Sequence, residues 1–197
     1  MKRTALLVIC LSMLTALVGC GQSNEKATDA SNSEKQSESV EIKSAPIRED
    51  VCALYLEVLE DLWNVDSGLN SEIYQIGIDL SELSRLTEVE KDTVMSEFAS
   101  KHNLPYIAGT WEELCEQGFI DKENLYWKDG LFFSIKTNED AVGNLPAEIE
   151  GNSVPERTSF EAQKWRSGLG AYFFGRCTAQ KNADGKWSYT VGQEAIS

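Results

Sequence analysis

The sequence predicts an α+β fold in which helices come first in the chain and an antiparallel sheet comes last. Apolar residues recur at every third or fourth position up to about residue 117, as on a helix face, and at every second position from about residue 131, as in half-buried strands. All five tryptophans, six tyrosines and seven phenylalanines follow residue 44, so a single core of about 150 residues is expected there. We expect the helices to pack on one face of a curved sheet of about four strands.

The first expected helix opens this domain after Ser44 and Pro46, which are typical of a helix start. Its apolar face is formed by Ile47, Val51, Leu54, Tyr55, Val58, Leu62 and Trp63. Asp66-Ser67-Gly68 ends the helix. The isoleucines over residues 73–80 then indicate a short extended segment.

Two further helices are expected before the sheet. The first of them reaches His102 and stops before Pro105. Its apolar residues are Leu83, Leu86, Val89, Val94 and Phe98. The other covers residues 111 to about 117, because Thr110 and Glu113 have the spacing of a capping box and Gly118 is a typical stop.

The last part of the chain alternates between apolar and polar residues. The expected strands cover residues 131–136, 158–165, 171–179 and 186–191. Turn sequences at Ser167-Gly168 and at residues 182–185 join the last three of them. These connections predict an antiparallel meander.

The first twenty residues have the pattern of an export signal. A basic start precedes an apolar stretch over residues 5–18, which is too short to cross ~30 Å of hydrocarbon. The stretch ends in Leu17-Val18-Gly19-Cys20, which resembles the bacterial lipobox. The resemblance implies that residues 1–19 are removed and that a diacylglycerol is attached to the thiol of Cys20. It also implies a protein anchored on the extracytoplasmic side of the cell membrane. An ordinary secretory signal with a chance cysteine is the alternative.

Between the signal and the domain, residues 20–45 are polar and contain no aromatic residue, so we expect a disordered tether that begins at the lipidated Cys20. The domain itself covers residues 46–197. Removal of the signal takes two of the 18 basic residues and none of the 32 acidic residues, which leaves a formal charge near −16. Such a surface repels phosphates, so nucleic acid is not an expected partner.

Four short stretches of the domain stand out. They are Ile76-Gly77-Ile78-Asp79-Leu80-Ser81, Thr110-Trp111-Glu112-Glu113-Leu114, Lys164-Trp165-Arg166-Ser167-Gly168-Leu169-Gly170-Ala171 and Lys186-Trp187. Together they resemble an uncharacterised extracytoplasmic domain of Clostridia-type bacteria, found in small lipoproteins and in the outer parts of membrane-bound regulatory peptidases. The resemblance implies no activity. The element order is also similar to the cystatin-like or nuclear-transport-factor-like cone.

Few residues offer the chemistry of an enzyme. His102 is the only histidine, which excludes an H-E-x-x-H metal site, and its place at a helix end favours a structural role. Neither a G-x-S-x-G elbow nor a phosphate-binding glycine loop occurs. Asp79 and Glu82 fit the start of a helix better than a pair of catalytic acids. We therefore expect no catalytic activity, no cofactor and no metal site.

Three cysteines remain beside Cys20 and the signal's Cys10, namely Cys52, Cys115 and Cys177. An odd number allows at most one disulfide within the domain, and buried unpaired thiols are the main expectation. The alternative to a binding protein is a hydrolase of the cell envelope with a carboxylate-based site or a site that pairs His102 with Cys52 or Cys115.

One segment is a candidate for ligand binding. On a strand, Lys164 and Arg166 share one face while Trp165 takes the other. With Tyr172 they are placed at the mouth of a sheet-lined pocket, where a basic spot on an acidic protein favours an anionic ligand. The structural alternative is a hairpin with Trp165 in the core. The leading expectation is a binding module for an unidentified protein or small molecule.

Overall fold

The computed structural model describes residues 48–138 and 156–197. The chain divides into two units, Met1–Lys43 and Ser44–Ser197, and all described elements belong to the second. The expected signal, Cys20 and the tether over residues 20–45 lie outside the described residues. Within the described residues, no helix combines the length and apolar character that a membrane span needs.

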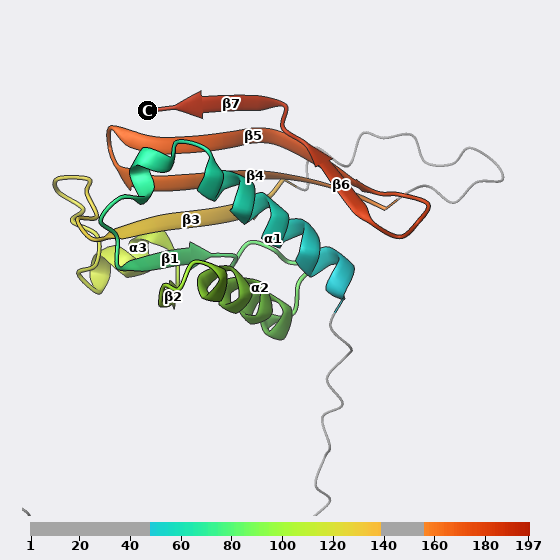
Figure 1. Ribbon diagram of the computed structural model, residues 1–197, viewed down its shortest axis with the longest axis horizontal. Coiled ribbons are helices and arrows are strands. Elements are labelled where there is room, and N and C mark those ends of the chain that lie inside the picture. Colours follow the sequence, from blue (N-terminus) through green and yellow to red (C-terminus); the bar gives the residue numbers. More distant parts are fainter. Residues whose placement is uncertain (1–47, 139–155) are drawn as a thin grey trace, which may run out of the picture. The chain divides into compact units, whose positions relative to one another are not determined.

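The described residues form an α+β fold, as the sequence predicts, with three α-helices, one short 3-10 helix and a seven-stranded sheet (Figure 1). In chain order the elements are α1 (Glu49–Asn64), η1 (Ser67–Asn70), β1 (Gln75–Asp79), α2 (Glu88–Lys101), β2 (Tyr106–Ala108), α3 (Trp111–Glu116), β3 (Gly130–Thr137), β4 (Arg157–Ser167), β5 (Gly170–Lys181), β6 (Trp187–Thr190) and β7 (Gln193–Ile196). The number of strands exceeds the expected four because β1, β2 and β7 join the sheet.

The sheet is mixed rather than purely antiparallel. Its strand order is β2-β1-β3-β4-β5-β6, and β7 also pairs with β5. Strand β1 is parallel to both β2 and β3, whereas the pairs from β3 onward are antiparallel. Parallel neighbours need a crossover, and α2 supplies it between β1 and β2 while α3 lies in the connection from β2 to β3. The predicted antiparallel meander of four strands is confirmed as β3-β4-β5-β6, and the parallel β1 and β2 extend the sheet beyond it.

Helices α1 and α2 pack side by side on one face of the sheet and run in the same direction. At their beginnings the Arg48 guanidinium lies 3.0 Å from the Glu90 carboxylate, and at their ends Lys101 lies 3.2 Å from Glu60. Alternate residues of the strands point into the core beneath these helices. The strand residues buried there are Ile76, Ile78, Leu131, Phe133, Ile135, Phe160, Ala162, Phe174, Cys177 and Ala179.

Helix α3 lies on the opposite face, so the expectation that all helices share one face is wrong for this element. Leu114 of α3 packs with Trp127 and Phe132 in a separate cluster. Gly77 of β1 makes room for it, because a Cβ atom at this position would lie 2.5 Å from the Leu114 side chain. The short α3 begins at the predicted capping box, in which Thr110 and Glu113 each bind the other's backbone.

Candidate ligand-binding face

Lys164, one of the residues that the sequence singles out, lies on the helix-bearing face and is fully buried at 0 % exposure. Its ammonium donates to the carbonyl oxygens of Trp63 and Asp66, at 3.4 and 3.2 Å, and to that of Val65. A fourth contact joins it to the side-chain oxygen of Asn70 at 3.2 Å. Burial lowers the pKa of Lys164 to about 8. These contacts cap the end of α1. Because they occupy the ammonium group of Lys164, this group is not free to donate hydrogen bonds to a ligand.

The side chain of Arg166 is likewise held by hydrogen bonds to backbone oxygens. Its guanidinium donates to the carbonyl oxygens of Leu69 at 3.0 Å, Ser71 at 2.6 Å and Lys128 at 3.0 Å. The side chain therefore fastens the β4–β5 hairpin to η1 and to the loop before β3. At the tip of that hairpin Leu169 is 93 % exposed.

The two aromatic candidates lie apart from each other. Trp165 takes the opposite face from its neighbours, as expected, and its ring meets that of Trp111 edge to face at 6.0 Å. Tyr172 lies opposite Lys164 in the β4–β5 pair, and its hydroxyl donates to Glu194. The four residues are thus close along the strands, but they do not line one common pocket.

The thiols and the imidazole proposed for the alternative site are also separated. His102 follows α2 and stacks on Trp63 of α1 at 3.8 Å, and burial lowers its pKa. Cys52 lies near the beginning of α1, 11 residues before Trp63, which is about 16 Å along a helix. Cys115 is on α3, across the sheet. All three domain cysteines are free, and burial raises the pKa of Cys177 to about 12.

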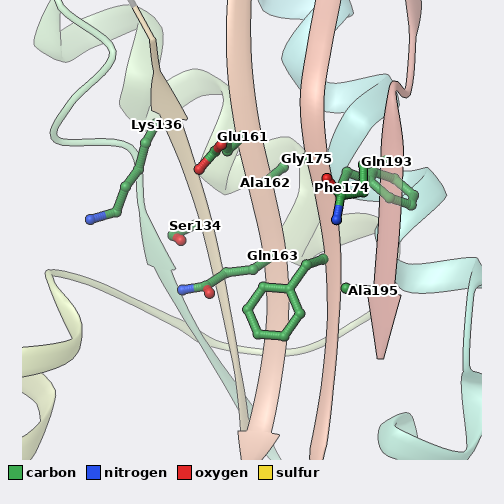
Figure 2. Close-up of a pocket in the computed structure, with 10 residues that line it drawn as sticks. Ser134, Lys136, Glu161, Ala162, Gln163, Phe174, Gly175, Gln193 and Ala195 are labelled. Carbon is green, nitrogen blue, oxygen red and sulfur yellow. The ribbon is translucent and has the colours of Figure 1, made fainter. Parts of the chain in front are cut away.

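A different site appears where the second face of the sheet lacks a helix. Leu114 of α3 packs at the β1 and β3 side of this face, whereas a pocket with a volume of about 260 Å³ lies over β3, β4, β5 and β7 (Figure 2). It is lined by Ser134, Lys136, Glu161, Ala162, Gln163, Phe173, Phe174, Gly175, Gln193 and Ala195.

Strand register arranges most of these residues in two rows across the sheet. The first row joins Ser134, Gln163, Phe173 and Ala195 through successive pairs. In the second row Lys136 pairs with Glu161, and Gly175 pairs with Gln193. Neighbouring strands lie ~4.8 Å apart, so each row spans about 14 Å over four strands.

A bulge and a glycine create the hollow in the second row. Between the pairs Phe160–Cys177 and Ala162–Phe174, β5 carries one more residue than β4. The backbone accommodates this extra residue at Arg176, which has a left-handed φ of 53°. Beside it, Gly175 leaves the sheet surface bare, since a Cβ there would meet only Gln193, at 3.6 Å.

Most polar side chains of the pocket have no hydrogen-bond or ion-pair partner among the described residues. Lys136 binds Glu82 at 2.9 Å, and this hydrogen bond raises the pKa of the lysine. Among the described residues, the side chains of Ser134, Glu161, Gln163 and Gln193 form no hydrogen bond or ion pair that would occupy them. Ser134 is buried and Gln163 is half-buried, where polar groups normally have partners, whereas Glu161 and Gln193 are exposed to solvent. A pocket with these four polar groups around the partly exposed Phe173 is suited to binding a polar molecule.

Reasoning from sequence missed these residues, although a signal for part of the site was present. The alternation in residues 131–136 and 158–165 puts Ser134 with Lys136, and Glu161 with Gln163, on the faces turned away from Phe133 and Phe160. The register that aligns the two pairs, and the pairing of β7, depend on the folded sheet.

Comparison of the chain with protein-family models, with curated proteins and with solved structures gave no match. The resemblances to a Clostridia-type lipoprotein domain and to a cystatin-like or nuclear-transport-factor-like cone stay predictions from the sequence.

Proposed function

We propose that this chain is a membrane-anchored extracytoplasmic lipoprotein whose domain over residues 46–197 binds a small polar molecule and performs no chemistry. The anchor is a diacylglycerol on Cys20, and the binding site is the open-face pocket. The lipobox-like Leu17-Val18-Gly19-Cys20 supports the first part of the proposal.

The observation that carries the second part is the set of uncommitted polar groups around Phe173. Ser134, Glu161, Gln163 and Gln193 come from three different strands, and they meet on the part of the sheet that α3 leaves bare. A volume of about 260 Å³ suits a small molecule better than a protein surface.

A hydrolase of the cell envelope is the second candidate, and the described geometry favours it less. Catalysis by a cysteine needs a thiol within hydrogen-bond reach of the base. His102 instead stacks on Trp63, and its Nε2 atom lies 3.3 Å from the Glu60 carboxylate. Cys52 lies toward the other end of α1, where its thiol faces the backbone oxygen of Glu90 at 3.9 Å.

The anchor is tested by the Cys20→Ala variant, with Cys10→Ala as a matched control in the expected signal. In a bacterial host that processes lipoproteins, the unaltered chain and Cys10→Ala should sediment with the membrane, and Cys20→Ala should not. If Cys20→Ala sediments as the unaltered chain does, the lipid anchor is refuted.

The binding site is tested on the full chain carrying Cys20→Ala, which needs no detergent. We would record amide NMR shifts while adding three classes of small probe, namely neutral saccharides, amino acids and dipeptides, and choline. At least one class should shift amides of β3, β4, β5 and β7 around the pocket. No shift in this region with any probe would contradict the proposal.

A further inference from the structure

We infer that the open-face pocket binds a neutral, polyhydroxylated ligand of the chemical class of a mono- or disaccharide. This inference rests on the proposed function, because it names the ligand class of the same pocket. It follows from the charges of the pocket, from its hydrogen-bonding groups and from the position of Phe173.

The charges of the pocket disfavour an anionic ligand. Lys136 is the one cation among the lining residues, and it is paired with Glu82 at 2.9 Å. Glu161 adds a carboxylate that has no cationic partner among the described residues. An anion would therefore meet repulsion without a free positive charge to offset it.

An organic cation is also poorly matched. Recognition of an ammonium group uses a cage of several aromatic rings or several carboxylates. The described pocket offers the ring of Phe173 on its open face and the single free carboxylate of Glu161. The remaining polar groups are amides and a hydroxyl, which carry no charge.

The hydrogen-bonding groups fit a ligand that both donates and accepts. The amides of Gln163 and Gln193 and the hydroxyl of Ser134 can each act in both ways, while the carboxylate of Glu161 only accepts. A hydroxyl group has the same double character. Several adjacent hydroxyls on one rigid ring could satisfy these four side chains together, and a bond to the carboxylate would be the strongest of them.

The aromatic ring occupies the place that a sugar ring requires. Phe173 lies between Gln163 and Ala195 in the first row, and Gly175, two residues along β5, leaves the hollow beside it. A pyranose has an apolar C–H face and a rim of hydroxyls. Its apolar face can pack on Phe173 while the rim reaches the amides and the carboxylate, so one ring uses both parts of the pocket.

The experiment is a titration of the full Cys20→Ala chain with glucose, N-acetylglucosamine, cellobiose and chitobiose, followed by amide NMR and calorimetry. At least one sugar should bind with shifts centred on the two rows. Gln163→Ala should weaken this binding about fivefold, as expected for one lost hydrogen bond. The matched control is Gln180→Ala, which removes the same side chain from an exposed position of β5 outside the pocket and should leave the affinity unchanged.

A second pair of variants keeps the test independent of folding defects. Gly175→Val places a side chain in the hollow, in a backbone conformation without positive φ, and should abolish sugar binding. Phe173→Ala should weaken it at least tenfold. Thermal melts of both variants would establish that they are folded before binding is measured.

The outcomes separate the inference from the proposed function. If amino acids, dipeptides or choline shift the pocket amides and no sugar does, the saccharide class is wrong and the binding module stands. If a sugar binds equally well to Gly175→Val, the ligand does not occupy this pocket and the inference fails. If no probe of any class acts on this face, both fail.

Discussion

Replacement of Lys164 by methionine separates a structural role from a ligand-binding role. The variant keeps the length and volume of the side chain but removes the ammonium, which leaves the oxygens of Trp63, Val65, Asp66 and Asn70 without this donor. Leaving a buried acceptor without its donor costs about 1–3 kcal/mol. Relief of the buried charge offsets part of this cost, so we expect a loss of roughly 2–3 kcal/mol of unfolding free energy.

Chemical denaturation of Lys164→Met and of the unaltered chain measures this loss, and thermal melts should show a decrease in Tm of roughly 5–10 °C for a domain of this size. The matched control is Lys186→Met, at an exposed lysine in the turn before β6, which should change stability by less than about 0.5 kcal/mol. If Lys164→Met is as stable as the control, the capping role of Lys164 is refuted.

The same substitution has a signature in pH. The pKa of Lys164 is about 8 in the fold and has an ordinary value of 10.5. Between these values the unfolded chain keeps a proton that the folded chain has lost, so the unaltered protein gains stability as pH rises from 8 toward 10.5. Lys164→Met should lack this gain, and equal pH dependence of both proteins would contradict the reasoning.

Three further predictions concern packing, titration and reactivity. Gly77→Ala should cost about 1–3 kcal/mol, since its Cβ would lie 2.5 Å from the Leu114 side chain, whereas Gly68→Ala meets its nearest atom at 3.6 Å and should be neutral in the same denaturation assay. Because burial lowers the pKa of His102, NMR titration should give this histidine a pKa below 6.5. The protein should then lose stability as the pH falls below 6.5, because the unfolded chain binds the proton more readily. A measured pKa above 6.5 would refute the lowering by burial. In the native state a maleimide should label Cys115 before the two buried domain cysteines, and uniform labelling rates would contradict the described burial.

The helices show what periodicity can and cannot predict. The apolar face of α1 was predictable because nearly all of its residues face one core. The second helix was predicted too early, since Leu83 and Leu86 continue the helical spacing but lie buried in the turn before Thr87, the observed N-cap. Asp79, expected near a helix start, ends β1 instead and accepts two hydrogen bonds from Ser81. Spacing alone does not distinguish a helix from a buried turn.

The sheet was predictable where strands are long and connected by tight turns. The hairpin of β4 and β5 closes at Ser167 and Gly170, as the turn sequence indicates. Strand β2 has three residues and β7 has four exposed ones, so neither carries enough alternation to be recognised. Which face α3 covers follows from the close contact of Gly77 with Leu114, which involves two parts of the chain 37 residues apart. Such pairings exist only in the folded domain.

The candidate site was less predictable than the fold. Lys164, Trp165 and Arg166 attract notice in the sequence because a cation, an indole and a guanidinium are adjacent, yet these groups hold the hairpin to its surroundings. The pocket side chains, such as Gln163 and Gln193, are ordinary polar residues of strands. Their significance comes from lying together without partners, which no linear pattern records.

Because strand residues alternate between the two faces of the sheet, the residues that stabilise the core differ from those that line the pocket. Phe133 and Ile135 contribute to the core beneath α1 and α2, whereas the intervening Ser134 and the following Lys136 belong to the pocket. Substitutions on the pocket side can therefore change what is bound while the packing beneath the helices stays intact. A scaffold built in this way can diverge in specificity by a few point mutations, each tolerated on its own, and it offers the same freedom to directed evolution.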